Sequence, residues 1–127
     1  MNLTISILLI TVGLINFLPV IGIISAEKLS AAYAVELIGN DIVILMRHRA
    51  LLFGLIGGFM LYSVWKPSYQ SVAMVMAAIS MLGFLFFVAA ADHYNASITK
   101  IAIIDLIGLA GLAIAAGLKY LSRNSLF

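Results

Sequence analysis

Four apolar stretches, each long enough to cross the hydrocarbon core of a membrane, constrain this chain most strongly. They cover about residues 3–25, 42–65, 68–91 and 101–120. A hydrocarbon core of about 30 Å is crossed by roughly 20 helical residues. Because lipid offers no partner to backbone N–H and C=O groups, each stretch is expected to be an α-helix. The sequence therefore predicts an all-α integral membrane four-helix bundle, with residues 1–127 as a single transmembrane domain.

The composition agrees with this class and excludes a soluble domain. Hydrophobic residues make up 65% of the 127 positions and charged residues 9%, whereas a typical soluble domain has about 25% charged residues. The chain has no cysteine, which removes disulfides, thiolate metal sites and cysteine nucleophiles. The net charge of +2 comes from residues scattered at the ends of the apolar stretches, so we expect no nucleic-acid partner.

The connections between the stretches are short except for the first. Pro19 lies inside the first stretch and is expected to kink that helix or free carbonyls near its end. Between the first two spans, residues 27–37 place apolar side chains at helical spacing, which predicts a short interfacial helix, with Gly39 suited to its C-terminal cap. Lys66 and Pro67 predict a tight turn, so the second and third helices should be antiparallel neighbours.

Four crossings place both termini on one side of the membrane, but the charge pattern leaves open which side. The basic residues of the connections and tail divide almost evenly between the two sides. If Arg47 and Arg49 are embedded, the positive-inside rule favours cytoplasmic termini, and if they count as loop residues the rule narrowly reverses. We expect a multi-pass protein whose termini lie in the cytoplasm.

The residues Arg47-His48-Arg49 form a cationic group inside an apolar run and are the main candidate for a functional site. Arg47 lies six residues past Asp41, roughly 9 Å along the helix axis. Asp105 lies five residues past Lys100, at the same end of the bundle and at a similar depth. The loop at this end carries two further polar candidates. The predicted ligand-binding residues are Arg47, His48, Arg49, Asp105, His93 and Asn95.

Two interpretations of this cluster stay open. Arginines near a helix end can extend toward lipid headgroups, with Asp105 neutralising one of them and holding two helices in register. Alternatively, the arginines bind a phosphate, an anionic headgroup or a quinone carbonyl, and His48 carries a proton. The three consecutive side chains point about 100° apart, so they cannot all face one pocket. With two histidines and no cysteine, neither a metal nor a cofactor is expected, and no catalytic residue is assigned.

The small residues of the second and fourth spans have two readings as well. Glycines allow helices to approach closely, or they leave room for the tail of an amphiphile. The residues concerned are Gly54, Gly57, Gly58, Gly108 and Gly111. Rows of small residues like these also suit contact with a second copy of the chain or with a larger membrane complex.

The run from Asn40 to Gly58, together with Asn95 and Asp105, resembles small, largely uncharacterised bacterial four-helix inner-membrane proteins that are similar to the DoxX-like proteins. The resemblance spans most of the chain and implies the bacterial inner (cytoplasmic) membrane as its location. It implies no particular activity.

The functional expectation is a non-enzymatic one. We expect the protein to bind a membrane lipid or a quinone-like amphiphile, or to be an accessory subunit of a membrane complex. The alternative is a membrane enzyme or redox component that uses His48 as proton carrier, with Arg47, Arg49 and Asp105 orienting the ligand.

Overall fold

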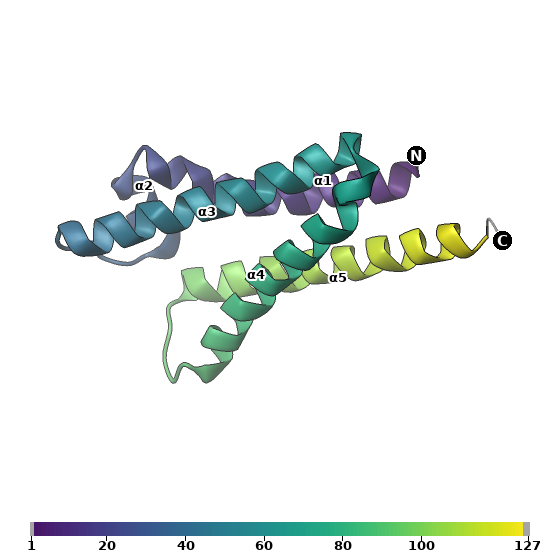
Figure 1. Ribbon diagram of the computed structural model, residues 1–127. Coiled ribbons are helices and arrows are strands. Elements are labelled where there is room, and N and C mark those ends of the chain that lie inside the picture. The colour runs from purple at the N-terminus through teal and green to yellow at the C-terminus, as the bar shows by residue number, and fades with distance from the viewer. Residues whose placement is uncertain (1, 126–127) are drawn as a thin grey trace.

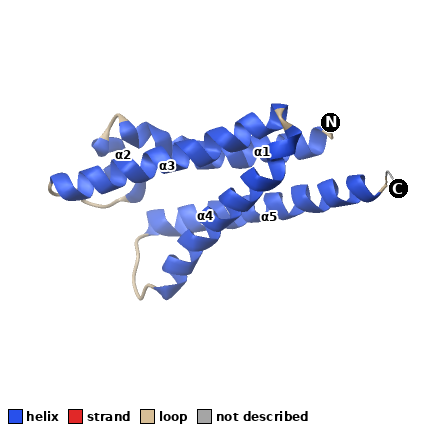
Figure 2. Cartoon of the chain, viewed as in Figure 1, coloured by secondary structure: helices blue, strands red, loops and turns tan. Residues whose placement is uncertain are grey.

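A computed structural model describes residues 2–125, and this part of the chain contains helices and no strand (Figures 1 and 2). Four helical segments in it are long and apolar enough to cross a membrane, as the sequence predicts. In chain order, the elements are α1 (Leu3–Phe17), η1 (Leu18–Ile23), α2 (Ala26–Tyr33), α3 (Asn40–Trp65), η2 (Pro67–Tyr69), α4 (Gln70–Ala90) and α5 (Ala96–Asn124).

The helices alternate in direction, and the two ends of the bundle differ. Both described ends of the chain and the turn at η2 lie at one end, while α2 and the connection between α4 and α5 lie at the other (Figure 1). α1 packs against α3 and α5, and α4 packs against α5 and α3. The turn at Lys66 and Pro67 makes α3 and α4 antiparallel neighbours, which confirms that prediction.

The half of the bundle nearest the termini is closely packed. Leu9, Met60 and Met81 are almost completely buried where α1, α3, α4 and α5 meet. A methyl group added at Gly57 would lie 2.5 Å from the backbone nitrogen of Phe17 and 2.7 Å from the carbonyl oxygen of Gly13. The absence of a side chain at Gly57 therefore allows α1 and α3 to approach this closely, so this glycine serves packing.

The other half of the bundle holds a smaller core beneath α2. Leu29 and Tyr33 of α2 are buried with Ala50 of α3. The helix α2 is shorter than predicted: it ends at Tyr33, and Ala34 takes the left-handed conformation with a φ of 51°. Gly39, with a φ of 88°, instead precedes α3. The prediction that Gly39 caps this helix is therefore wrong, because the chain leaves the helix five residues earlier.

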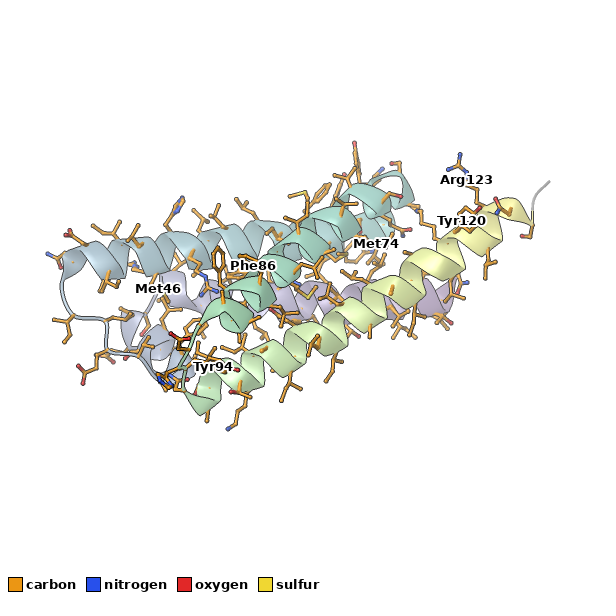
Figure 3. The ribbon with its side chains drawn as sticks, turned by 90° about the horizontal axis from the view of Figure 1, so that it is seen from below. Met46, Met74, Phe86, Tyr94, Tyr120 and Arg123 are labelled. Carbon is orange, nitrogen blue, oxygen red and sulfur yellow. The ribbon has the colours of Figure 1, made fainter. Side chains whose placement is uncertain are left out.

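The last helix is longer than the predicted span of 101–120. The side-chain oxygen of Asn95 accepts a hydrogen bond from the backbone N–H of Ile98 at 2.9 Å, which caps the start of α5. At its other end the helix continues through polar residues, and Figure 3 shows Tyr120 and Arg123 on turns that extend beyond the other helices. An apolar window underestimates such a helix because polar residues at its ends remain helical.

Large apolar side chains cover the outside of the bundle. They are exposed on all four long helical segments, and examples are Ile7, Ile44, Leu55, Ile79, Phe87 and Leu106. A soluble monomer rarely exposes so large a contiguous apolar surface.

Candidate functional site

Arg47 ties α3 to the end of the first helical segment. Its Nε and Nη2 donate hydrogen bonds to the carbonyl oxygen of Ile23, at 2.8 and 2.5 Å. Ile23 is the last residue of η1, the 3-10 segment that contains Pro19, so the sequence prediction of a disturbed helix end is confirmed. Arg47 thus satisfies a carbonyl at a helix terminus and lies outside the cavities described below.

The next two residues have different surroundings, as expected from the 100° between successive side chains. His48 is exposed and lines neither cavity. Arg49 is half-buried, and its guanidinium carbon lies 4.8 Å from the ring centre of Phe53, 5.2 Å from that of Tyr33 and 5.8 Å from that of Phe84. These distances permit cation–π attraction to three rings, which come from α2, α3 and α4.

A cavity of about 560 Å³ adjoins Arg49. Its wall is mainly apolar and is formed by α1, η1, α2, α3 and α5, with one residue from α4. The lining residues are Ile15, Asn16, Leu18, Pro19, Ile21, Lys28, Leu29, Ala32, Tyr33, Arg49, Phe53, Phe84, Ile101, Ile104, Asp105 and Ile107. We call this space the Arg49 cavity. It lies beneath α2, at the predicted end of the bundle.

The polar groups of this cavity include two acceptors. Asn16 is only 3% exposed, and its Nδ2 donates a hydrogen bond to the carbonyl of Val12 at 3.0 Å. The Oδ1 of Asn16 makes no hydrogen bond within residues 2–125. Every fully enclosed side-chain nitrogen or oxygen in this part of the chain has a hydrogen-bond partner, so the Oδ1 of Asn16 is not fully enclosed and opens into the cavity. Asp105 is half-buried on the same wall.

Arg49 and Asp105 line the same cavity, but no hydrogen bond joins their side chains. Asp105 lies within electrostatic reach of Arg49. Over the described chain, neither the guanidinium of Arg49 nor the carboxylate of Asp105 hydrogen-bonds to another protein group. The predicted pairing of Asp105 with an arginine is therefore an interaction across a space, in which both groups keep their hydrogen-bonding capacity.

A second cavity of about 510 Å³, more open to the outside than the first, lies between α3 and α4. It shares Arg49, Phe53 and Phe84 with the first cavity and is otherwise lined by apolar residues, Gly83 and Ser80. Arg49 and the two phenylalanines therefore stand where the two spaces meet.

The two predicted site residues of the α4–α5 loop, Asn95 and His93, do not line the Arg49 cavity. Asn95 donates from Nδ2 to the carbonyl oxygens of Tyr33 and Ala34, at 2.9 and 3.0 Å, which joins the start of α5 to the end of α2. His93 is exposed in the same loop and lines neither cavity. Of the six predicted site residues, the structure brings only Arg49 and Asp105 together at a cavity.

Sequence reasoning missed several residues of this site. Asn16 had a detectable signal, because an amide in the middle of an apolar helix requires a partner. The aromatic residues around Arg49, namely Tyr33, Phe53 and Phe84, had none, since aromatic side chains are common throughout membrane helices.

Comparisons of the chain with models of protein families, with curated proteins and with solved structures find no match. The resemblance to DoxX-like proteins therefore stays a prediction.

Proposed function

We propose that this protein is a multi-pass membrane protein that binds a lipid-like or quinone-like amphiphile in the Arg49 cavity, with the polar head of the ligand at Arg49. One observation carries the proposal. The guanidinium of Arg49 lies on the wall of a mainly apolar cavity of about 560 Å³, and within residues 2–125 its N–H groups have no hydrogen-bond partner.

The aromatic rings around Arg49 satisfy only part of its bonding capacity. A guanidinium has five N–H donors in its plane, and rings that attract its charge do not accept these hydrogen bonds as oxygen does. A half-buried cation without acceptors is costly. A phosphate, carboxylate or carbonyl oxygen in the cavity supplies the missing acceptors, and hydrogen bonds to charged groups are the stronger ones.

The rim of the cavity gives an apolar tail a path to the outside. Leu18 and Ile21 of η1 and Ile104 and Ile107 of α5 line the cavity and are also exposed on the bundle surface. The tail of a bound amphiphile therefore leaves between η1 and α5 and continues among apolar side chains. This shape matches a molecule whose head is recognised and whose tail remains in lipid.

The exposed apolar surface of the four long segments supports insertion in a membrane. We propose the bacterial inner membrane, with the termini in the cytoplasm and α2 at the opposite interface. Arg47 bonds to the carbonyl of Ile23 and Arg49 adjoins a cavity, so we count both as embedded and not as loop residues. With both arginines embedded, the positive-inside rule favours cytoplasmic termini.

The alternative of a membrane enzyme or redox component receives less support from the geometry. It requires a proton carrier next to the ligand head, and His48 lies outside both cavities. We therefore propose ligand binding without a reaction. A role as accessory subunit is compatible with it, because the bound amphiphile can belong to a larger complex.

Native mass spectrometry of gently extracted protein tests the proposal. The wild type is compared with Arg49→Gln and with the control Arg123→Gln, which removes an exposed cation from the end of α5. Loss of charge-assisted hydrogen bonds worth about 1.5–3 kcal/mol lowers retention of the ligand roughly ten- to hundredfold in Arg49→Gln. Equal amounts of co-purified ligand in all three proteins would mean that Arg49 recognises no ligand.

A further inference from the structure

We infer that the Arg49 cavity selects a zwitterionic lipid, one whose head carries a phosphate and, next to it, an ammonium group. This inference rests on the proposed function and specifies its ligand. The phosphate lies at Arg49, and the ammonium lies at Asp105 and the Oδ1 of Asn16.

The cavity presents groups of both kinds to a ligand head. Arg49 is a donor that carries a positive charge, and Lys28 of α2, exposed at the surface, adds a second cation to the same wall. Asp105 of α5 is an acceptor that carries a negative charge. Asn16, only 3% exposed, adds an amide oxygen to which no group within residues 2–125 donates a hydrogen bond.

A head with only negative charge is attracted by Arg49 and Lys28 but fits poorly at Asp105. Its phosphate would satisfy Arg49 but would bring a second anion close to Asp105, and like charges at short range in a poorly solvated site repel strongly. Its neutral remainder would offer the Asp105 carboxylate no positive charge beyond that of Arg49, which the phosphate already engages. Such a ligand is therefore penalised where Asp105 is present.

An uncharged head leaves Arg49 and Asp105 with only each other as counter-charge, across a space and with no hydrogen bond between them. Burying Arg49 and Asp105 against apolar or weakly polar atoms costs free energy that hydrogen bonds to a neutral group only partly offset. A zwitterionic head is the case in which each protein charge gains a partner of opposite sign. An ammonium with N–H donors also reaches the two acceptors, whereas a quaternary ammonium has no N–H to donate.

The dimensions of the site agree with a lipid head followed by tails. A volume of about 560 Å³ lies within the ordinary range of about 300–1,000 Å³ for small-molecule sites, which leaves room for the head and the first part of the tails. The remaining tail length passes the exposed rim residues Leu18 and Ile107. Head and tails thus match the polar wall and the apolar rim, respectively.

A lipid competition experiment tests this inference. Delipidated full-length protein in detergent is titrated with phosphatidylethanolamine and phosphatidylglycerol of identical acyl chains, and bound lipid is counted by native mass spectrometry. We expect at least tenfold preference for phosphatidylethanolamine in the wild type. Asp105→Asn brings the ratio close to one by weakening phosphatidylethanolamine and strengthening phosphatidylglycerol. The matched control Asp92→Asn, which changes an exposed carboxylate in the α4–α5 loop, keeps the wild-type ratio.

The other outcomes of this experiment distinguish failure of the zwitterion inference from failure of the proposed amphiphile binding. Equal binding of the two lipids by the wild type, or an unchanged ratio in Asp105→Asn, overturns the zwitterion inference while binding at Arg49 stands. Binding of decylubiquinone in preference to both phospholipids does the same. Retention of none of the three compounds by the wild type overturns the proposed function together with the inference.

Discussion

Replacing Gly57 by alanine is expected to destabilise the bundle, because the added methyl group meets backbone. Its carbon would lie 2.5 Å from the nitrogen of Phe17, whereas ordinary van der Waals contacts begin at 3.4 Å, so α1 and α3 must separate locally by 3.4 − 2.5 = 0.9 Å. Overpacking of this kind costs about 1–3 kcal/mol, and backbone obstacles place the cost at the upper end of that range. The free energy of unfolding, measured by SDS titration of the detergent-solubilised protein, should fall by this amount.

The neighbouring glycine provides a matched control. A methyl group added at Gly58 would have its nearest contact at 3.9 Å, with the ring of Phe17. Gly58→Ala introduces the same atoms one position along α3 and should leave the free energy of unfolding within about 0.5 kcal/mol of the wild type. If both variants were equally stable, the close approach of α1 and α3 at Gly57 would be refuted, and with it the conclusion that this glycine serves packing.

Three further results are expected. Asn95→Ala removes the cap of α5 and the donor to the carbonyls of Tyr33 and Ala34 at the end of α2, and should lower the free energy of unfolding by about 2–3 kcal/mol in the same titration. A smaller loss would mean that these hydrogen bonds contribute little to stability. Asp105→Asn and Arg49→Gln should show a coupling energy of about 0.5–1 kcal/mol in a double-mutant cycle, and strict additivity would mean that the two charges do not interact. With cytoplasmic termini, an impermeant maleimide should label Ser97→Cys and leave Ser68→Cys unlabelled in intact cells, and the reverse pattern would invert the orientation.

The sequence predicted the four helices because apolar length is a strong local signal, and the bounds of the first three spans agree within two residues, whereas the fourth helix is longer at both ends. The first span was predicted to reach residue 25 with a disturbance at Pro19, and the helical segment ends at Ile23, with η1 following α1 after Phe17 because proline removes a backbone donor. The fourth was predicted to begin at residue 101, but the cap at Asn95 starts α5 at Ala96. Such boundaries depend on individual hydrogen bonds, which hydropathy does not report.

The predicted site residues come from one end of the bundle, and two of the six line a common cavity there. Depth follows from counting residues along a helix, which placed Arg49 and Asp105 together. The direction in which a side chain points around the helix axis does not follow from such counting, because it depends on which neighbours the helix packs against. Arg47 therefore bonds to Ile23 while Arg49 adjoins a cavity, a difference that only the packing of η1 against α3 reveals.

Photo-crosslinking with an amphiphile that carries a reactive diazirine next to its head tests the central claim most directly. After illumination of the protein in membranes, mass spectrometry of its peptides locates the labelled residues. A head bound at Arg49 should label the cavity wall, at Phe53, Phe84 or Ile104, and Arg49→Gln should abolish this labelling. Labelling confined to outward-facing residues such as Leu55 and Val75, with the same yield in Arg49→Gln, would show that the amphiphile only surrounds the protein and would contradict the account.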